Sequence, residues 1–374
     1  MSFEAPTVHP GPGTYQCATG VFNRLENDLK DYQYSRVLLV HGEESLKAAK
    51  AYLPDFNETE VSWIQYRGIC SDSETERVAE AAQQAGSQAV IGLGGGSVLD
   101  LAKAAASRLA QDAILLPTLA STCAAWTGLS VIYDDEHRFT RFDVYNRPAR
   151  LVLVEPRIIA TAPIDYLRAG IADTLAKWYE ARALAETLGD PPVPVALALS
   201  TARYCQTALL EHAEEAVRSA EKGELSPALQ KVIETNILAG GLVGSLGEKY
   251  GRVAAAHSVH NALTQFEETR TLLHGEKVAY GILVQLVLER RKEEIRQLRP
   301  FYQALRLPST LEDLDLRNTP EVKEDLANWT LKPGESIHQM GKSVTETDLV
   351  RAIDELEAER AVNHPRGQGS RLSD

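Results

Sequence analysis

The chain has 374 residues, with 39 Lys and Arg against 52 Asp and Glu, so its formal net charge is −13. Apolar residues make up 44% of it and charged residues 24%, values that exclude general disorder. This length predicts two or three domains. Because the balance is acidic and no basic cluster stands out, the charge favours a small-molecule partner over nucleic acid or an anionic membrane.

The four cysteines, Cys17, Cys70, Cys123 and Cys205, are widely scattered and form no CxxC pair. This usage is typical of reduced thiols rather than of a secreted disulfide scaffold. The first residues lack the basic start and apolar centre of a signal peptide. We therefore expect a cytoplasmic protein.

The first 160 residues alternate short apolar runs with Ala- and Glu-rich stretches that have helical spacing. This alternation predicts a parallel sheet covered by helices on both faces. The expected strands are Val37–Val40, Ala89–Leu93, Ala113–Leu116 and Leu151–Val154, and the clearest helices are Glu74–Ala85 and Val98–Leu109.

Residues 113–133 carry no charge and are about as many as a membrane span needs. Pro117, Gly128 and several hydroxyl side chains interrupt them, so we predict a buried strand, a polar loop and a second strand. That second strand, Leu129–Tyr133, and Arg138–Val144 are the two arms of an expected β-hairpin.

From about Ala162 the sequence is rich in Ala, Leu, Glu and Lys and predicts helices only. Breaks are expected at Asp190–Pro192, at Lys222 and Gly223, and over Gly247–Gly251. The predicted domains are therefore an α/β unit, 1–160, and a helical unit, 161–374. The polar tail 363–374 is expected to fray.

A glycine run joins one expected strand to the next helix. It reads Gly94, Gly95, Gly96 and Ser97, and the helix after it carries Asp100 and Lys103. Unpaired N–H groups and the positive helix end suit a pyrophosphate there. The glycines permit positive φ and close backbone approach, and Ser97 can donate a hydroxyl or cap the helix. The run is neither GxGxxG nor a P-loop, so a simple tight turn is an equal alternative.

Three segments of the helical half carry potential metal ligands: Asp173 in AGIAD, His257 in HSVH and His274 in LHGE. His257 follows an apolar stretch, a poor place for an imidazole with no partner. Two imidazoles and one carboxylate would form an open site for Zn²⁺ or Fe²⁺. Taken singly, each histidine is better explained by a structural role than by metal binding.

Six segments, spread in order over both halves of the chain, form one recognisable set. They are GLGGGSVLDLAK at 92–103, LPTLAST at 116–122, LSVIY at 129–133, AGIADTLAKWYEA at 169–181, AAHSVHNALT at 255–264 and LHGEKVAYG at 273–281. Together they resemble the iron-containing type of metal-dependent alcohol dehydrogenases, in particular their glycerol dehydrogenase branch.

The resemblance implies a fold like that of dehydroquinate synthase and glycerol dehydrogenase. An α/β NAD(P)-binding domain is followed by an all-α domain, with a divalent metal in the cleft between them, Zn²⁺ rather than Fe²⁺. It implies that Asp173, His257 and His274 hold the metal. It implies that the pyrophosphate binds Gly94, Gly95, Gly96 and Ser97, and that the cofactor site is also lined by Thr118, Ser121, Thr127, Leu129 and Tyr133.

Two departures from glycerol dehydrogenases concern the substrate. Cys123 stands where those relatives carry an Asp that contacts glycerol, and Trp126 follows it closely. Lys177 lies one turn after Asp173, where iron-type relatives often place a further His ligand. Lys177 either pairs with Asp173 or Glu180, or it receives a substrate carboxylate beside the metal. The pattern is most similar to hydroxycarboxylate dehydrogenases, which reduce 2-oxo acids.

Two further positions leave alternatives open. Gly42 follows an expected strand where NAD-specific relatives tend to have Asp. Its lack of a carboxylate admits NADPH, although Glu43 and Glu44 are close by and Gly42 is equally a turn glycine. His260, three residues after His257, is either a group beside the metal ligands, able to relay a proton, or a core histidine.

The sequence thus predicts a metal-dependent NAD(P)H oxidoreductase that interconverts a small 2-oxo acid and its 2-hydroxy acid. A dehydrogenase of glycerol or another polyol is the alternative. A lyase similar to 3-dehydroquinate synthase needs more basic residues than Lys177 and Lys277 provide, and a silent nucleotide-binding protein would not need all the ligands. We expect a homo-oligomer with no nucleic-acid or membrane partner.

Overall fold

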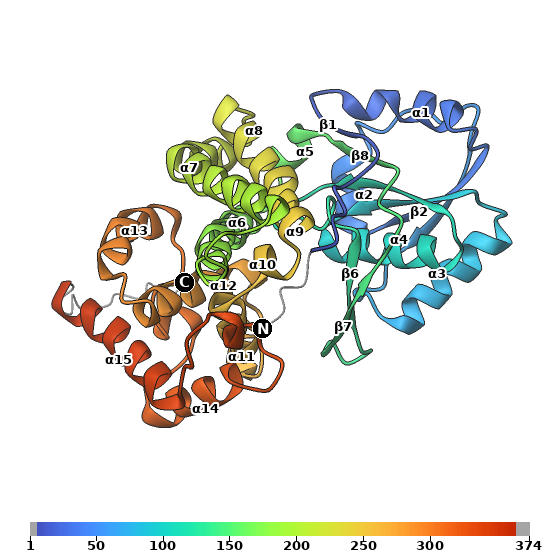
Figure 1. The fold of residues 1–374 in the computed structure, drawn as a ribbon. Coiled ribbons are helices and arrows are strands. Elements are labelled where there is room, and N and C mark those ends of the chain that lie inside the picture. Colours follow the sequence, from blue (N-terminus) through green and yellow to red (C-terminus); the bar gives the residue numbers. More distant parts are fainter. Residues whose placement is uncertain (1–5, 364–374) are drawn as a thin grey trace.

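The structure is a computed structural model that describes residues 6–363, with side chains described up to residue 358. Figure 1 shows a sheet with its helices on one side of the molecule and the helical second half on the other. The predicted frayed tail lies outside the described residues, except for Asn363, which ends the last helix. The α/β and all-α fold class is confirmed. A boundary at residue 160 stays a prediction.

The central sheet has six strands in the order β1-β8-β5-β4-β2-β3, and every neighbouring pair is parallel. The four predicted strands are all present, and two more occupy the edges. The strands are β1 (Tyr15–Cys17), β2 (Arg36–His41), β3 (Glu60–Gln65), β4 (Ala89–Gly94), β5 (Asp112–Pro117) and β8 (Leu151–Val154).

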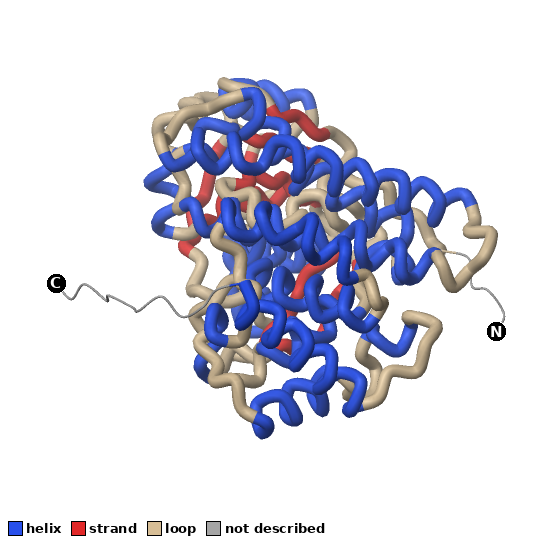
Figure 2. Tube along the Cα trace, turned by 90° about the vertical axis from the view of Figure 1, so that its left-hand side faces the viewer, coloured by secondary structure: helices blue, strands red, loops and turns tan. Residues whose placement is uncertain are grey.

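Alternate residues of the strands enter two different hydrophobic clusters. Leu38, Val90 and Leu115 pack with α3 (Asp72–Gln84) and α4 (Gly96–Arg108), whereas Leu39 and Ile91 pack with α1 (Leu25–Asp31) and α2 (Glu43–Ala49). Both faces are therefore buried, as a parallel sheet requires, and Figure 2 shows the strands among the helices. The helical segments of this half are η1 (Val21–Arg24), α1 (Leu25–Asp31), α2 (Glu43–Ala49), α3 (Asp72–Gln84), α4 (Gly96–Arg108) and α5 (Pro156–Ala160).

The predicted hairpin is also present, as β6 (Leu129–Tyr133) and β7 (Phe139–Val144) in an antiparallel sheet of its own. Strand β6 lies along α4, where Ser130 Oγ donates to the Asp100 carbonyl at 2.7 Å. The uncharged segment 113–133 is thus β5, a loop and β6, as expected. No helix among the described residues has the length and apolar character to cross a bilayer.

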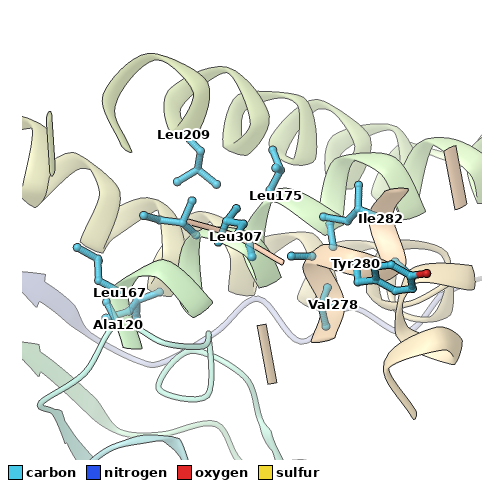
Figure 3. Close-up of a cluster of buried hydrophobic side chains, with 14 of the residues drawn as sticks. Ala120, Leu167, Leu175, Leu209, Val278, Tyr280, Ile282 and Leu307 are labelled. Carbon is cyan, nitrogen blue, oxygen red and sulfur yellow. The ribbon is translucent and has the colours of Figure 1, made fainter. Parts of the chain in front are cut away.

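The second half is helical, as predicted. Its segments are α6 (Ile164–Ala185), α7 (Val193–Glu221), α8 (Pro227–Glu234), the π-helical η2 (Thr235–Ala239), α9 (Gly240–Gly247), α10 (Lys249–Arg252), α11 (Ala255–Leu263), η3 (Glu267–Thr269), α12 (His274–Leu288), α13 (Lys292–Leu305), η4 (Glu312–Leu314), α14 (Pro320–Thr330), η5 (Ser336–Gln339) and α15 (Glu346–Asn363). The core between α6, α7 and α12 includes Leu175, Leu209 and Ile282 (Figure 3).

One predicted break differs in detail. The segment Gly247–Gly251 is not a continuous loop, because α9 ends at Gly247 and the short helix α10 begins at Lys249. Only Glu248 interrupts the helical path, at φ 49 and ψ −125. The other two breaks, before α7 and before α8, lie where the sequence predicted them.

Candidate active site

Three helices bring Asp173, His257 and His274 together. Their potential ligand atoms all lie within 4.8 Å of one another. The Nε2 atoms of His257 and His274 are 3.4 and 3.3 Å from Asp173 Oδ1. Asp173 and His257 are buried, whereas the side chain of His274 is 39% exposed. Two imidazole nitrogens and a carboxylate oxygen are ligands that suit Zn²⁺ or Fe²⁺ and leave coordination positions open.

Two glycines allow the backbones around this group to approach closely. A Cβ on Gly275 of α12 would lie 1.8 Å from the carbonyl oxygen of Ala169 on α6. A Cβ on Gly170 would lie 1.9 Å from the carbonyl oxygen of Ala120, which belongs to the loop after β5. Gly275 therefore lets α12, which carries His274, approach α6, which carries Asp173, and Gly170 lets the loop after β5 approach α6.

Glu180, one of the buried residues of α6, holds His257 in place. Its Oε2 accepts from His257 Nδ1 at 2.6 Å, and its Oε1 accepts from the backbone N–H groups of Ala254 and His257 at 2.6 and 3.0 Å. A carboxylate bonded to Nδ1 fixes the tautomer that presents Nε2 to a metal. From the sequence, Glu180 was predicted only as a partner of Lys177, because nothing local connects it with residues 254–257.

The charges in this group reinforce one another. Burial alone would raise the pKa of Asp173, but the Lys177 ammonium and the two histidines hold that pKa well below its usual range. Burial opposes a charge on His257 as well, yet the carboxylates of Glu180 and Asp173 raise its pKa to about 9. Asp173 is thus ionised and ready to ligate, and a proton on His257 must leave before a metal can bind.

Lys177 lies beside the carboxylate of Asp173 without a close hydrogen bond. Its Nζ is 3.7 Å from Asp173 Oδ1, and the residue is buried. Burial disfavours its charge, but Asp173 more than compensates, so the pKa of Lys177 is raised and the ammonium persists. Lys177 must be charged both to form an ion pair within the protein and to receive a substrate carboxylate. In the structure its ion pair is with Asp173.

Cys123 lies on the loop between β5 and β6 and is partly buried. Burial raises the pKa of its thiol, so the group is a neutral, weakly polar one. All four cysteines are free, as expected. Trp126, on the same loop, is turned toward structural partners: its indole N–H donates to the Pro10 carbonyl at 3.1 Å, and its ring packs on Tyr15.

His260 stands at the edge of the group. The centre of its ring is 4.1 Å from that of His274, and its Nδ1 contacts Asn261 Oδ1 at 3.1 Å. Burial and the neighbouring His274 and His257 hold the pKa of His260 well below its usual range. The ring is therefore neutral and supports the position of His274; a role in proton relay stays a prediction.

The glycine run lies where the sheet topology favours a nucleotide. Chain connections run outward in opposite directions from β2 and β4, and ligands of open parallel sheets bind outside the carboxyl ends at such a switch point. Gly42, after β2, and Gly94 to Ser97, after β4, flank this point. Helix α4 begins with the N-cap Gly95, so its free N–H groups face the same edge.

Two details of the predicted loop were wrong. Gly95 has φ −78, and none of Gly94, Gly95 and Gly96 has a positive φ. Glycine is required there for space, because a Cβ on Gly94 would lie 2.8 Å from Val98 Cβ and one on Gly95 2.9 Å from Leu119 Cδ1. Ser97 is not the cap either, since it lies in the first turn of α4 and is exposed.

The other predicted cofactor residues follow β5 and its loop. Thr118 is buried, and its N–H donates to the Gly94 carbonyl at 3.0 Å. Ser121 and Thr127 lie on the loop, while Leu129 and Tyr133 begin and end β6. Whether these residues touch a cofactor stays a prediction.

The contacts that hold this loop in place were not predicted from the sequence. Lys103 of α4 is buried, pairs with Asp100 at 2.9 Å, and donates to the carbonyl oxygens of Ala124, Thr127 and Leu129. A single ammonium therefore joins the helix after the glycine run to the loop that carries Cys123. The signal was available, since a lysine amid alanines on an apolar helix needs buried acceptors.

Gly42 is the N-cap of α2 and has φ −79, so it is not a turn glycine of the positive-φ kind. Its N–H donates to Ser45 Oγ at 3.0 Å, and Ser45 Oγ donates to the Leu93 carbonyl at the end of β4. Glu43 and Glu44 both pair with Lys47 on the surface. Their charges are thereby partly neutralised at the edge where a ribose would lie.

Residues 12–156 match the iron-containing alcohol dehydrogenase family. Hydroxycarboxylate dehydrogenase A of Escherichia coli (strain K12) is 41% identical over 354 residues, which cover 94% of this chain and 97% of that protein. The chain belongs to the iron-containing alcohol dehydrogenase family. It is thus a metal-dependent NAD(P)-linked dehydrogenase or reductase that acts on CH–OH groups.

Two glycerol dehydrogenases are similar over nearly the whole chain. The protein from Escherichia coli O6:H1 is 38% identical over 352 residues, covering 91% of this chain and 94% of that protein. The crystal structure of glycerol dehydrogenase from Schizosaccharomyces pombe matches with a TM-score of 0.87 and 29% identity, covering 99% of this chain and 96% of that one. The fold and the family inferred from the sequence are therefore confirmed.

Proposed function

We propose that this dehydrogenase interconverts a small 2-oxo acid and its 2-hydroxy acid. The observation that carries the proposal is the buried ammonium of Lys177 beside the three potential ligands. At 3.7 Å from Asp173 the pair is looser than a charge-assisted hydrogen bond. Among the described residues no acceptor lies within hydrogen-bond distance of Lys177 Nζ, so its N–H groups are available to a substrate carboxylate.

Asp173, His257 and His274 are the proposed ligands of one divalent metal, Zn²⁺ in preference to Fe²⁺. When bound, the metal would polarise the substrate oxygen and the nicotinamide would exchange hydride with the substrate carbon. Glu180 holds the imidazole of His257 in the ligating tautomer. Gly94, Gly95, Gly96 and Ser97 would receive the cofactor pyrophosphate on their backbone N–H groups.

The neutral thiol of Cys123 supports the same substrate class. A thiol accepts hydrogen bonds from substrate hydroxyls weakly, and burial keeps it protonated. The 41% identity to a protein named hydroxycarboxylate dehydrogenase A agrees with this proposal. NADPH as well as NADH would fit at Gly42, which offers no carboxylate to repel a 2′-phosphate.

The test compares substrates in the Lys177→Met variant, which keeps most of the side-chain length and loses the charge. A charge-assisted bond is worth about 1.5–3 kcal/mol, so kcat/KM for 2-oxobutyrate should fall roughly ten- to hundred-fold. The value for a neutral ketone or aldehyde should change far less, and Lys177→Arg should retain part of the preference.

Equal losses on both substrates would contradict the proposal, because they would mean that Lys177 only supports Asp173 and the metal. A wild-type enzyme that oxidises glycerol better than 2-hydroxybutyrate would also contradict it, in favour of a polyol dehydrogenase.

A further inference from the structure

The β6–β7 hairpin exposes an unusual amount of apolar surface on one of its strands. Phe139, Phe142 and Val144 of β7 are 55%, 60% and 53% exposed. The outer edge of β6 is covered by α4, since the Val131 N–H donates to Asp100 Oδ2 at 3.0 Å. No strand among the described residues pairs with the outer edge of β7. Proteins normally protect such an edge with Lys, Pro or a covering segment.

The hydrogen-bond pattern of the hairpin shows which backbone groups point outward. The Tyr145 N–H donates to the Gly128 carbonyl, so these two residues form a hydrogen-bonded pair. Pairs alternate along an antiparallel ladder, and Phe142 lies opposite Val131, whose N–H also points away from the partner strand. The N–H and carbonyl groups of Phe142 and Val144 therefore face the open edge.

The side chains of β7 are complementary to a second copy of the same strand. If a two-fold axis passes beside Phe142, an antiparallel partner places its Asp143 opposite Arg141 and its Arg141 opposite Asp143. Those positions form non-hydrogen-bonded pairs, in which side chains are closest. The two Phe142 rings then meet at the axis, and the backbone N–H and carbonyl groups of each Phe142 form hydrogen bonds with those of the other.

The ion pairs that Arg141 already makes within the chain are compatible with this pairing of two strands. Arg141 contacts Asp143 of its own strand at 2.8 Å and Asp72 of α3 at 2.7 Å, all on the less exposed face of the hairpin. In the paired strands the two Arg141 guanidinium groups and the two Asp143 carboxylates would lie at the corners of a square. Each positive group would have a negative group on either side. Charge complementarity therefore favours a second copy of this chain over an unrelated strand.

We propose that β7 is a homodimer interface, in which two hairpins join edge to edge into a four-stranded antiparallel sheet centred on Phe142. Isologous contacts of this kind are usual in homo-oligomers. The pairing covers part of the apolar side chains of Phe142 and Val144 and satisfies the open backbone groups. The interface does not depend on the substrate or on the metal.

Charge reversal tests the register of the pairing. Arg141→Glu and Asp143→Lys each place like charges opposite one another in a homodimer, so each variant should show about half the wild-type mass or less by light scattering. In a mixture of the two variants, the introduced carboxylate of one chain lies opposite the introduced ammonium of the other. The unchanged Asp143 and Arg141 of the two chains also face each other, so the wild-type mass should return. The proposal is overturned if the wild type is monomeric at micromolar concentration, if either variant keeps the full mass, or if mixing does not restore it.

A second pair of variants distinguishes this interface from nonspecific hydrophobic association. Phe142→Lys puts two ammonium groups on the two-fold axis and should also lower the mass. The matched control is Val193→Lys on α7, which removes a side chain that is 72% exposed and should leave the mass unchanged. Equal effects of the two substitutions would overturn the assignment to β7.

Discussion

Replacing Glu180 with Gln tests whether the residues beneath the ligands prepare them for a metal. The carboxylate accepts three hydrogen bonds, from two backbone N–H groups and from Nδ1 of His257. An amide has only one oxygen. If that oxygen keeps the backbone donors, its NH₂ group faces His257 Nδ1, which must then accept. The ring proton moves to Nε2, the atom that should bind the metal.

The magnitude follows from this change of tautomer. Loss of a partner that orients a ligand typically costs 10- to 100-fold in metal affinity, about 1.4–2.8 kcal/mol. We expect Glu180→Gln to lower the affinity for Zn²⁺ by this factor in a chelator-competition titration. Activity should recover in part when excess Zn²⁺ is added, because the ligands themselves remain.

A matched control is available near the end of the same helix. Glu186 is exposed and pairs with Arg291 at 2.8 Å, so Glu186→Gln removes the same charge at a distance from the ligands and should leave Zn²⁺ affinity unchanged. An unaltered affinity in a folded Glu180→Gln protein would refute the assigned role of Glu180, and so would equal losses in the two variants.

Three other substitutions probe the glycines of the site. Gly95→Val places a branched side chain where the pyrophosphate must approach, so the KM for the cofactor should rise roughly ten-fold or more; an unchanged KM in a folded variant contradicts the loop assignment. Gly275→Ala forces α12 away from the Ala169 carbonyl. It should lower the free energy of unfolding by about 1–3 kcal/mol, measured by calorimetry, and reduce the bound metal, measured by metal analysis. Gly42→Asp should raise the ratio of NADH to NADPH activity, because a carboxylate binds a ribose hydroxyl and repels a phosphate; a constant ratio would show that Gly42 lies away from the ribose.

The strands that the sequence predicts are those that the sheet buries on both faces. β2, β4, β5 and β8 are nearly continuous apolar runs, which is the pattern of a strand covered on two sides. The edge strands β1 and β3 were not predicted. Strand β3 alternates polar and apolar residues and has no run of buried positions, and β1 has only three residues. Pairing with a neighbour, rather than local propensity, makes these segments strands.

The candidate site shows the same difference between what local sequence predicts and what depends on contacts between distant segments. The residues Asp173, His257 and His274 were selected by their motifs, but their approach depends on glycine contacts between helices far apart in the sequence, such as Gly275 with Ala169. Sequence spacing cannot express such contacts. Lys103 shows the same limit, since its acceptors are carbonyl groups of a loop that no side-chain pattern identifies.

Lys177 and Glu180 show how a distant contact decides a local ambiguity. Their spacing of three residues on one helix permits an ion pair, and from the sequence alone Glu180 was as good a partner for Lys177 as Asp173. In the folded chain Glu180 is fully committed to the N–H groups of Ala254 and His257 and to the imidazole of His257. Lys177 is left with the looser contact to Asp173. A metal bound to Asp173 would compete with Lys177 for the same carboxylate. The ammonium of Lys177 would then need another anion as its partner. The carboxylate of a 2-oxo acid substrate would supply that negative charge.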